Sequence, residues 1–187
     1  MTRVTDELHQ PALRLRPMDP AEIPAYAARL EVEYAAELHT STGISKAAAE
    51  AESRQSTLES FPDGKLAPNE QIWVAEDATG DRVGVLWLAH LQAGTPKEHA
   101  WIYDIEVDEA RRGEGFGRAL LDLAEEQTRA LGLSSLRLNV FGRNRVAREL
   151  YRTQGFTESR VTMIKDVGVP RTGTNTEPPT QSLDVIG

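Results

Sequence analysis

Residues 102–132 contain a strand pattern, a glycine turn and a helix pattern in direct succession, and this arrangement constrains the fold more than any other part of the chain. The run at 102–107 is rich in β-branched and aromatic residues, which predicts a strand. Apolar residues then recur on one helical face from Phe116 to Leu131, and Gly132 is placed to cap that helix. A glycine turn that opens a helix presents free backbone N–H groups at the positive end of the helix dipole. The sequence therefore predicts a place that suits a phosphate or pyrophosphate.

Two well-known phosphate-binding patterns fit this turn poorly. The phosphate loop of nucleotide triphosphatases requires Gly-Lys-Ser or Gly-Lys-Thr, whereas this chain has Gly117-Arg118-Ala119. The dinucleotide fingerprint requires G-x-G-x-x-G and a later acidic residue, and the glycines here are spaced differently. A tight turn without any ligand is the third interpretation, and for an isolated glycine cluster it is the commoner one.

A second predicted helix distinguishes these alternatives. Asn144 and Tyr151 are seven positions apart, close to two helical turns, so both are expected on the same side. The turn and this helix together resemble the paired motifs of the GNAT superfamily of acyl-CoA-dependent N-acetyltransferases, in order and with no break in spacing. The matching residues are Arg112, Gly115 and Gly117 in the turn, and Asn144, Ala147, Tyr151, Gly155 and Phe156 in and after the helix.

The resemblance implies an α/β (α+β) fold, with a mixed, mostly antiparallel central sheet flanked by helices in the order β-α-α-β-β-β-α-β-α-β. The patterns along the chain agree with it. Strands are expected at 13–16, 71–76, 82–91, 99–107, 136–140 and 161–165, and helices at 23–38, 44–58, 116–131 and from 144 to Gly155. We predict a flexible N-terminus at 1–10, a single N-acetyltransferase domain at 11–167 and a Thr/Pro-rich C-terminal tail at 168–187.

The composition narrows the chemistry and the setting. Cysteine is absent, which excludes a thiolate metal site and a cysteine nucleophile, and the four histidines show no metal-ligand spacing, so no metal is expected. A net charge of −8 disfavours nucleic acid and suits a cationic amine, but is also ordinary solubilisation. No apolar stretch approaches the roughly 20 residues that span a bilayer, and no signal peptide is recognisable. We therefore expect a cytoplasmic protein without a membrane partner, and a homodimer is compatible with this interpretation.

The resemblance implies acetyl-CoA as the cosubstrate. Its pyrophosphate would contact backbone amides of residues 113–118, and its pantetheine arm would lie beside the strand at 105–107, where a splay from the strand at 135–140 opens an edge. A backbone N–H near Val107 would face the thioester oxygen. The implied cofactor-binding residues are Ile105, Glu106, Val107, Arg112, Gly113, Glu114, Gly115, Phe116, Gly117, Arg118 and Asn144.

Two of these residues have two roles open. Arg112 either pairs with a CoA phosphate or holds the turn in shape, and we favour the second role. Asn144 is a good N-cap residue and can also contact the pantetheine arm. Alternative cations for the adenosine 3'-phosphate are Arg111, Arg118, Arg143 and Arg145.

The resemblance also implies the catalytic groups. Tyr151 would protonate the leaving thiolate, a transfer from a pKa of ~10 to one of ~8.5 that is uphill by about 2 kcal/mol. Asp104 ranks first as the general base, and simple alternation puts Glu106 on the same side of the strand, although a bulge would reverse that facing. Solvated or ion-paired surface is the alternative role for both carboxylates.

The acceptor site is expected near residues 31–43, because the link between the first two helices borders it in the GNAT superfamily. Glu33, Tyr34, Glu37 and His39 lie there, either as ligands for an amine or as an ordinary polar helix face. We expect an N-acetyltransferase that moves an acetyl group from acetyl-CoA to a primary amine of a small molecule, peptide or protein, by direct attack in a ternary complex. The alternative is a non-catalytic acyl-CoA-binding sensor or scaffold module.

Overall fold

The structure, a computed structural model, describes residues 11–90, 99–165, 167 and 168. It divides into two compact units. The first unit comprises the described residues up to Pro20 together with 66–157, and the second comprises 21–65 and the described residues from Glu158 onward. The predicted flexible N-terminus and most of the predicted C-terminal tail lie outside the described residues.

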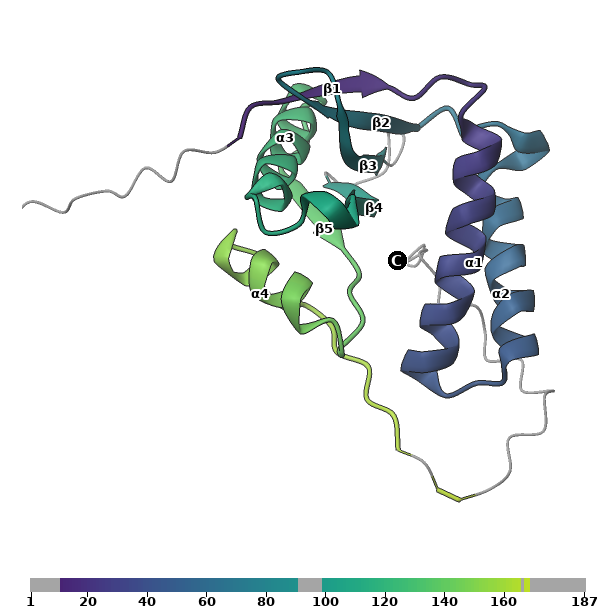
Figure 1. The fold of residues 1–187 in the computed structure, drawn as a ribbon. Coiled ribbons are helices and arrows are strands. Elements are labelled where there is room, and N and C mark those ends of the chain that lie inside the picture. Colours follow the sequence, from purple (N-terminus) through teal and green to yellow (C-terminus); the bar gives the residue numbers. More distant parts are fainter. Residues whose placement is uncertain (1–10, 91–98, 166, 169–187) are drawn as a thin grey trace, which may run out of the picture. The chain divides into compact units, whose positions relative to one another are not determined.

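The first unit is built on a five-stranded sheet (Figure 1). Its strands are β1 (Leu13–Pro17), β2 (Glu70–Asp77), β3 (Arg82–His90), β4 (His99–Val107) and β5 (Ser135–Leu138), in the spatial order β1-β2-β3-β4-β5. The pairs are antiparallel except β4–β5, which is parallel because α3 (Phe116–Ala130) crosses between these two strands. The mixed, mostly antiparallel sheet predicted from the sequence is therefore confirmed.

Helix α3 provides the core that fixes the sheet. Leu120, Leu121 and Ala124 on its apolar stripe are buried against a cluster that includes Leu86 and Ile102 of the sheet. Gly115 at its N-terminus has φ 91°, a left-handed conformation that glycine adopts without strain. α4 (Arg145–Thr153) follows β5 and packs Leu150 and Tyr151, with Phe156 beyond its end, against the same cluster.

A bulge in β4 separates two parts of the strand. Trp87 of β3 is opposite Asp104, but the next residue, Leu88, is opposite Ile102, so Tyr103 is an extra residue in β4. β5 pairs with His99–Ile102, and its described ladder stops there. From Asp104 onward β4 therefore pairs with β3 and has no described strand on the β5 side, which is the splay expected from the sequence.

The second unit contains the helices α1 (Ile23–Thr42) and α2 (Lys46–Ser60), which run side by side (Figure 1), and a short 3-10 turn at Pro62–Gly64. The Ser53 hydroxyl of α2 donates to the Glu31 carbonyl of α1 at 2.6 Å, and Tyr26 meets Phe61 edge to face. None of the described helices is long and apolar enough to cross a membrane.

The expected end of the first helix was wrong. The sequence predicts a helix that ends at residue 38, but α1 continues to Thr42 and stops at Gly43, which has φ 72°. The hydroxyls of Thr40 and Thr42 donate to the carbonyls of Ala36 and Leu38, four residues earlier, so both fit within the last helical turn.

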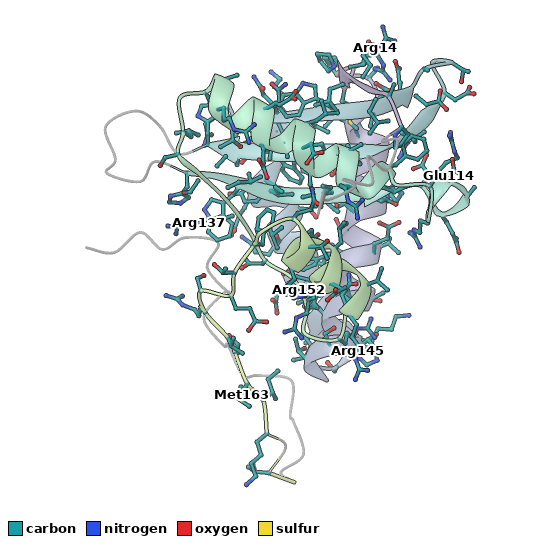
Figure 2. All side chains as sticks on the ribbon, turned by 90° about the vertical axis from the view of Figure 1, so that its left-hand side faces the viewer. Arg14, Glu114, Arg137, Arg145, Arg152 and Met163 are labelled. Carbon is teal, nitrogen blue, oxygen red and sulfur yellow. The ribbon has the colours of Figure 1, made fainter. Side chains whose placement is uncertain are left out.

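The expected sixth strand was also wrong, and the fifth is shorter than expected. Residues 158–165 form neither helix nor strand, and Val161 and Met163 are 65% and 91% exposed (Met163 is labelled in Figure 2). A strand requires a ladder partner as well as β-branched residues, and this segment pairs with none of the described strands. β5 ends at Leu138 rather than at 140 because its partner β4 diverges at the bulge.

Candidate active site

The glycine turn before α3 has the conformation of an anion-binding loop. Gly113 and Gly115 have φ 84° and 91°. Among the described residues, the backbone N–H groups of residues 113–117 find no hydrogen-bond acceptor. A Cβ on Gly117 would come within 3.1 Å of the Leu150 side chain, so glycine allows α4 to approach the start of α3. The turn thus presents free donors at a helix N-terminus, as an anion site requires.

Arg111 fixes the turn to the sheet. Its guanidinium donates to Asp77 at 2.9 Å and to Glu114, and it lies 4.7 Å from the centre of the Phe116 ring. Hydrogen bonds from Thr79 and from Arg111 hold the pKa of Asp77 well below its usual range. Arg111, one alternative cation for the 3'-phosphate, is therefore committed to contacts within the protein.

The other arginines are arranged differently. Arg112 is exposed, and its Nε donates to the Val107 carbonyl at 3.2 Å, which accords with the favoured conformational role. Arg145 and Arg152 lie on α4, and Glu114 projects from the turn (Figure 2). Arg118, on the first turn of α3, is partly buried. The roles of Arg112, Arg118, Arg143 and Arg145 toward a phosphate stay predictions.

The backbone of β4 beyond the bulge faces away from β3 at alternate residues. The N–H of Asp108 donates to the Val83 carbonyl at 2.9 Å, which fixes the phase of the antiparallel ladder. Because hydrogen-bonded pairs alternate along such a ladder, Glu106 bonds toward β3 and the peptide groups of Ile105 and Val107 point the other way. That is the side on which β5 has diverged, so the peptide groups of Ile105 and the N–H of Val107 are available to an extended ligand, whereas the Val107 carbonyl accepts from Arg112.

A pocket lies at the divergence of β4 and β5. It brings together Asp104 and Ile105 of β4 with Asn144 and Tyr151, which are the N-cap and a residue of α4. The full lining is Ile102, Tyr103, Asp104, Ile105, Leu138, Asn139, Val140, Phe141, Asn144 and Tyr151. Tyr103 and residues 139–141 are not among the predicted site residues. The bulge in β4 and the early end of β5 bring them to the pocket, and both depend on strand register rather than on a local sequence signal.

Tyr151 combines a packed ring with an accessible edge. The ring contacts Phe156, with centroids 5.6 Å apart, and the residue is half-buried. Burial raises the pKa of Tyr151 to about 12, and the charge of Asp104 adds to that rise. The phenol is therefore protonated at neutral pH, as a proton donor must be.

Asn144 occupies the N-cap of α4. Its side-chain oxygen accepts the backbone N–H of Ala147 at 3.1 Å, so the predicted capping role is present. The same residue lines the pocket. A contact with a cofactor stays a prediction.

The residues expected near the acceptor have partners within their own unit. Glu33 accepts from Arg29 at 2.7 Å, Glu37 accepts from Ser41, and the His39 ring is 2.7 Å from the Ile44 carbonyl. Burial, followed by the charge of Glu52, raises the pKa of Tyr34. Their part in acceptor binding stays a prediction.

Comparison with known proteins agrees with the fold and with the motifs in the turn and in α4. The model of the acetyltransferase (GNAT) family matches residues 33–156. The uncharacterized N-acetyltransferase YycN of Bacillus subtilis (strain 168) is 31% identical over 153 residues, which are 82% of this chain and 97% of YycN. YdgE of the same organism is 30% identical over 156 residues, 83% of this chain and 99% of YdgE. The crystal structure of YycN matches 83% of this chain and 99% of its own with a TM-score of 0.78.

The fold and these relatives define an acyltransferase. The chain belongs to the GNAT family of acetyltransferases, as the motifs in the turn and in α4 predicted. Members of this family use acetyl-CoA.

Proposed function

We propose that this chain transfers an acetyl group from acetyl-CoA to a primary amine by direct attack in a ternary complex. The observation that carries the proposal is the open backbone of β4 at Ile105 and at the N–H of Val107, with the pocket and Tyr151 beside it. An extended pantetheine arm fits such an edge as an added strand. The free N–H groups of residues 113–117 suit the pyrophosphate.

The residues beside the thioester divide the chemistry. The ammonium of the acceptor gives a proton to Asp104, directly or through water, and the neutral nitrogen attacks the thioester carbon. The N–H of Val107 stabilises the oxyanion. As the C–S bond breaks, Tyr151 gives its proton to the sulfur, and the tyrosinate regains a proton from the nitrogen of the new amide. The products are the acetylated amine and CoA with a free thiol, and one proton remains on Asp104.

A Tyr151→Phe variant tests the assignment of the acid. The ring and its contact with Phe156 are kept, so acetyl-CoA affinity should stay within about twofold. Loss of the proton donor should reduce the release of free thiol on a productive amine by about 100-fold or more. Unchanged thiol release in Tyr151→Phe would remove Tyr151 as the acid.

The alternative, a non-catalytic acyl-CoA-binding module, predicts binding without turnover. Acetyl-CoA at 100 times its dissociation constant should add about 2.7 kcal/mol to the free energy of unfolding. Mass spectrometry after incubation with acetyl-CoA and a panel of amines then separates the two functions. Stabilisation without any acetylated product would favour the module, and no stabilisation at millimolar acetyl-CoA would contradict both. A cytoplasmic location and a homodimer stay predictions.

A further inference from the structure

A half-buried carboxylate at the start of β2 takes no part in the reaction above. Glu70 accepts a hydrogen bond from the indole N–H of Trp87 on β3, with 3.0 Å between the nitrogen and the oxygen. In the part of the chain that the structure describes, no arginine, lysine or histidine forms an ion pair with Glu70. Burial raises the pKa of Glu70 to about 7, although the hydrogen bond from Trp87 acts to lower it. A buried carboxylate without a cationic partner is costly in a folded protein.

Tyr103 connects this carboxylate to the pocket. Its ring meets that of Trp87 edge to face, with centroids 5.2 Å apart, and Tyr103 as a whole residue is 39% exposed. Burial, followed by the charge of Glu70, raises the pKa of Tyr103, so the phenol and the carboxylate lie within electrostatic reach. Tyr103 also lines the pocket, next to Asp104. A carboxylate and an accessible aromatic ring therefore lie together on one side of the reacting centre.

We propose that Glu70 and Tyr103 bind a positively charged group of the acceptor other than the amine that reacts, with Trp87 as a positioning residue that orients both. The acceptor class is then a diamine, or an amine that carries a second cationic group. This inference rests on the proposed function.

The chemistry explains why a second charge is required. The reacting nitrogen must be neutral when it attacks, and its place is near Tyr151 and Asp104 in the pocket. A carboxylate beside an aromatic ring instead binds a group that keeps its charge, through a charge-assisted hydrogen bond and a cation–π contact. β2 and β4 are two strand spacings apart, about 10 Å, so one flexible diamine can reach both places.

The test compares 1,5-diaminopentane with pentylamine, which lacks the second charge. Calorimetric titration into the full chain with CoA bound gives the affinity, and acetyl-CoA-dependent product formation gives kcat/KM. The wild type should prefer the diamine by at least about tenfold in both measurements, the size of one charge-assisted hydrogen bond. Glu70→Gln keeps the shape and an acceptor for the Trp87 N–H, and it should lose most of this preference. Tyr103→Leu, which removes the ring, should lower it as well.

Glu126→Gln on the exposed face of α3 is the matched control for charge, and it should keep the preference. Equal affinity of the wild type for the two amines, or an undiminished preference in Glu70→Gln, would overturn the inference. A Glu70-dependent preference in binding without acetylation would support the inference and contradict the proposed acetyl transfer to such amines. Acetylation of both amines without any preference would support the proposed acetyl transfer and contradict the inference about Glu70 and Tyr103.

Discussion

Gly84 of β3 is the position where one added methyl group should disturb the open part of β4 most directly. Its ideal Cβ would lie 2.1 Å from the Glu106 carbonyl oxygen, 3.1 Å from the carbonyl carbon and 3.3 Å from the Val107 Cα. All three atoms are backbone, so no side chain can rotate away. Gly84→Ala therefore has to move β4 relative to β3.

The size of the effect follows from that distance. A carbon and a carbonyl oxygen approach to about 3.3 Å, so the strands must separate locally by about 1.2 Å. Overpacking of this kind destabilises the folded state by about 1–3 kcal/mol. Alanine also lowers the conformational entropy of the unfolded chain, which offsets less than about 1 kcal/mol of that loss. We expect a net loss of about 2 kcal/mol, which corresponds to a melting temperature about 4–8 °C lower for a chain of this length.

The displacement should also reach the chemistry. Residues 105–107 are where the proposed pantetheine arm and oxyanion lie, and a misplacement of about 1 Å near a reacting centre can reduce the rate 100-fold. Urea denaturation gives the change in stability, and free-thiol release gives kcat/KM. Gly142→Ala is the control, because a Cβ there has no atom within 4 Å, and its stability should stay within about 0.5 kcal/mol. A Gly84→Ala protein with wild-type stability and turnover would refute the close approach of β3 and β4.

Three further variants test other parts of the site. Asn144→Ala removes the N-cap of α4 and should cost about 1 kcal/mol in urea denaturation; an unchanged midpoint would contradict the capping role. Glu70 has a raised pKa of about 7, so the folded state binds more protons than the unfolded one and stability should fall as the pH rises from about 4.5 to 7. Partial solvent screening limits this loss to about 1–2 kcal/mol, and Glu70→Gln should abolish it; parallel pH profiles of the two proteins would argue against it. Arg112→Lys keeps the charge but loses the Nε contact with Val107, so acetyl-CoA affinity should fall as far as in Arg112→Gln. Full rescue by lysine would instead point to a phosphate contact.

Features that depend on a few neighbouring residues could be predicted from the sequence. The N-cap at Asn144, the glycine at the start of α3 and the shared side of Asn144 and Tyr151 follow from local backbone geometry, and the structure contains the cap, the positive φ of Gly115 and a pocket lined by both side chains. The strand at 161–165 failed for the opposite reason. Its residue pattern is local, whereas a strand exists only where another strand offers a ladder.

Tyr103 and Glu70 could not have been found by the same reasoning. Tyr103 reaches the pocket because β4 has one residue more than β3 at that point, and the register between two strands is not written in either strand alone. Glu70 is distinguished by the absence of a cationic partner among the described residues, which depends on every element packed around it. Sites that depend on the register between strands, or on packing between residues distant in the sequence, could therefore be identified only from the structure.

The neighbouring Asp104 and Tyr151 link the two proton transfers of the proposed reaction. While Asp104 is ionised, its charge adds to the rise that burial causes in the pKa of Tyr151. The phenol therefore stays protonated before the acceptor amine loses its proton. When Asp104 takes the proton of the ammonium, that charge is neutralised and its contribution to the pKa of Tyr151 disappears, whereas the larger contribution from burial remains. Tyr151 thus becomes a stronger acid at the stage at which the thiolate must leave. In the proposed reaction, deprotonation of the acceptor therefore lowers the pKa of Tyr151 before the thiolate leaves.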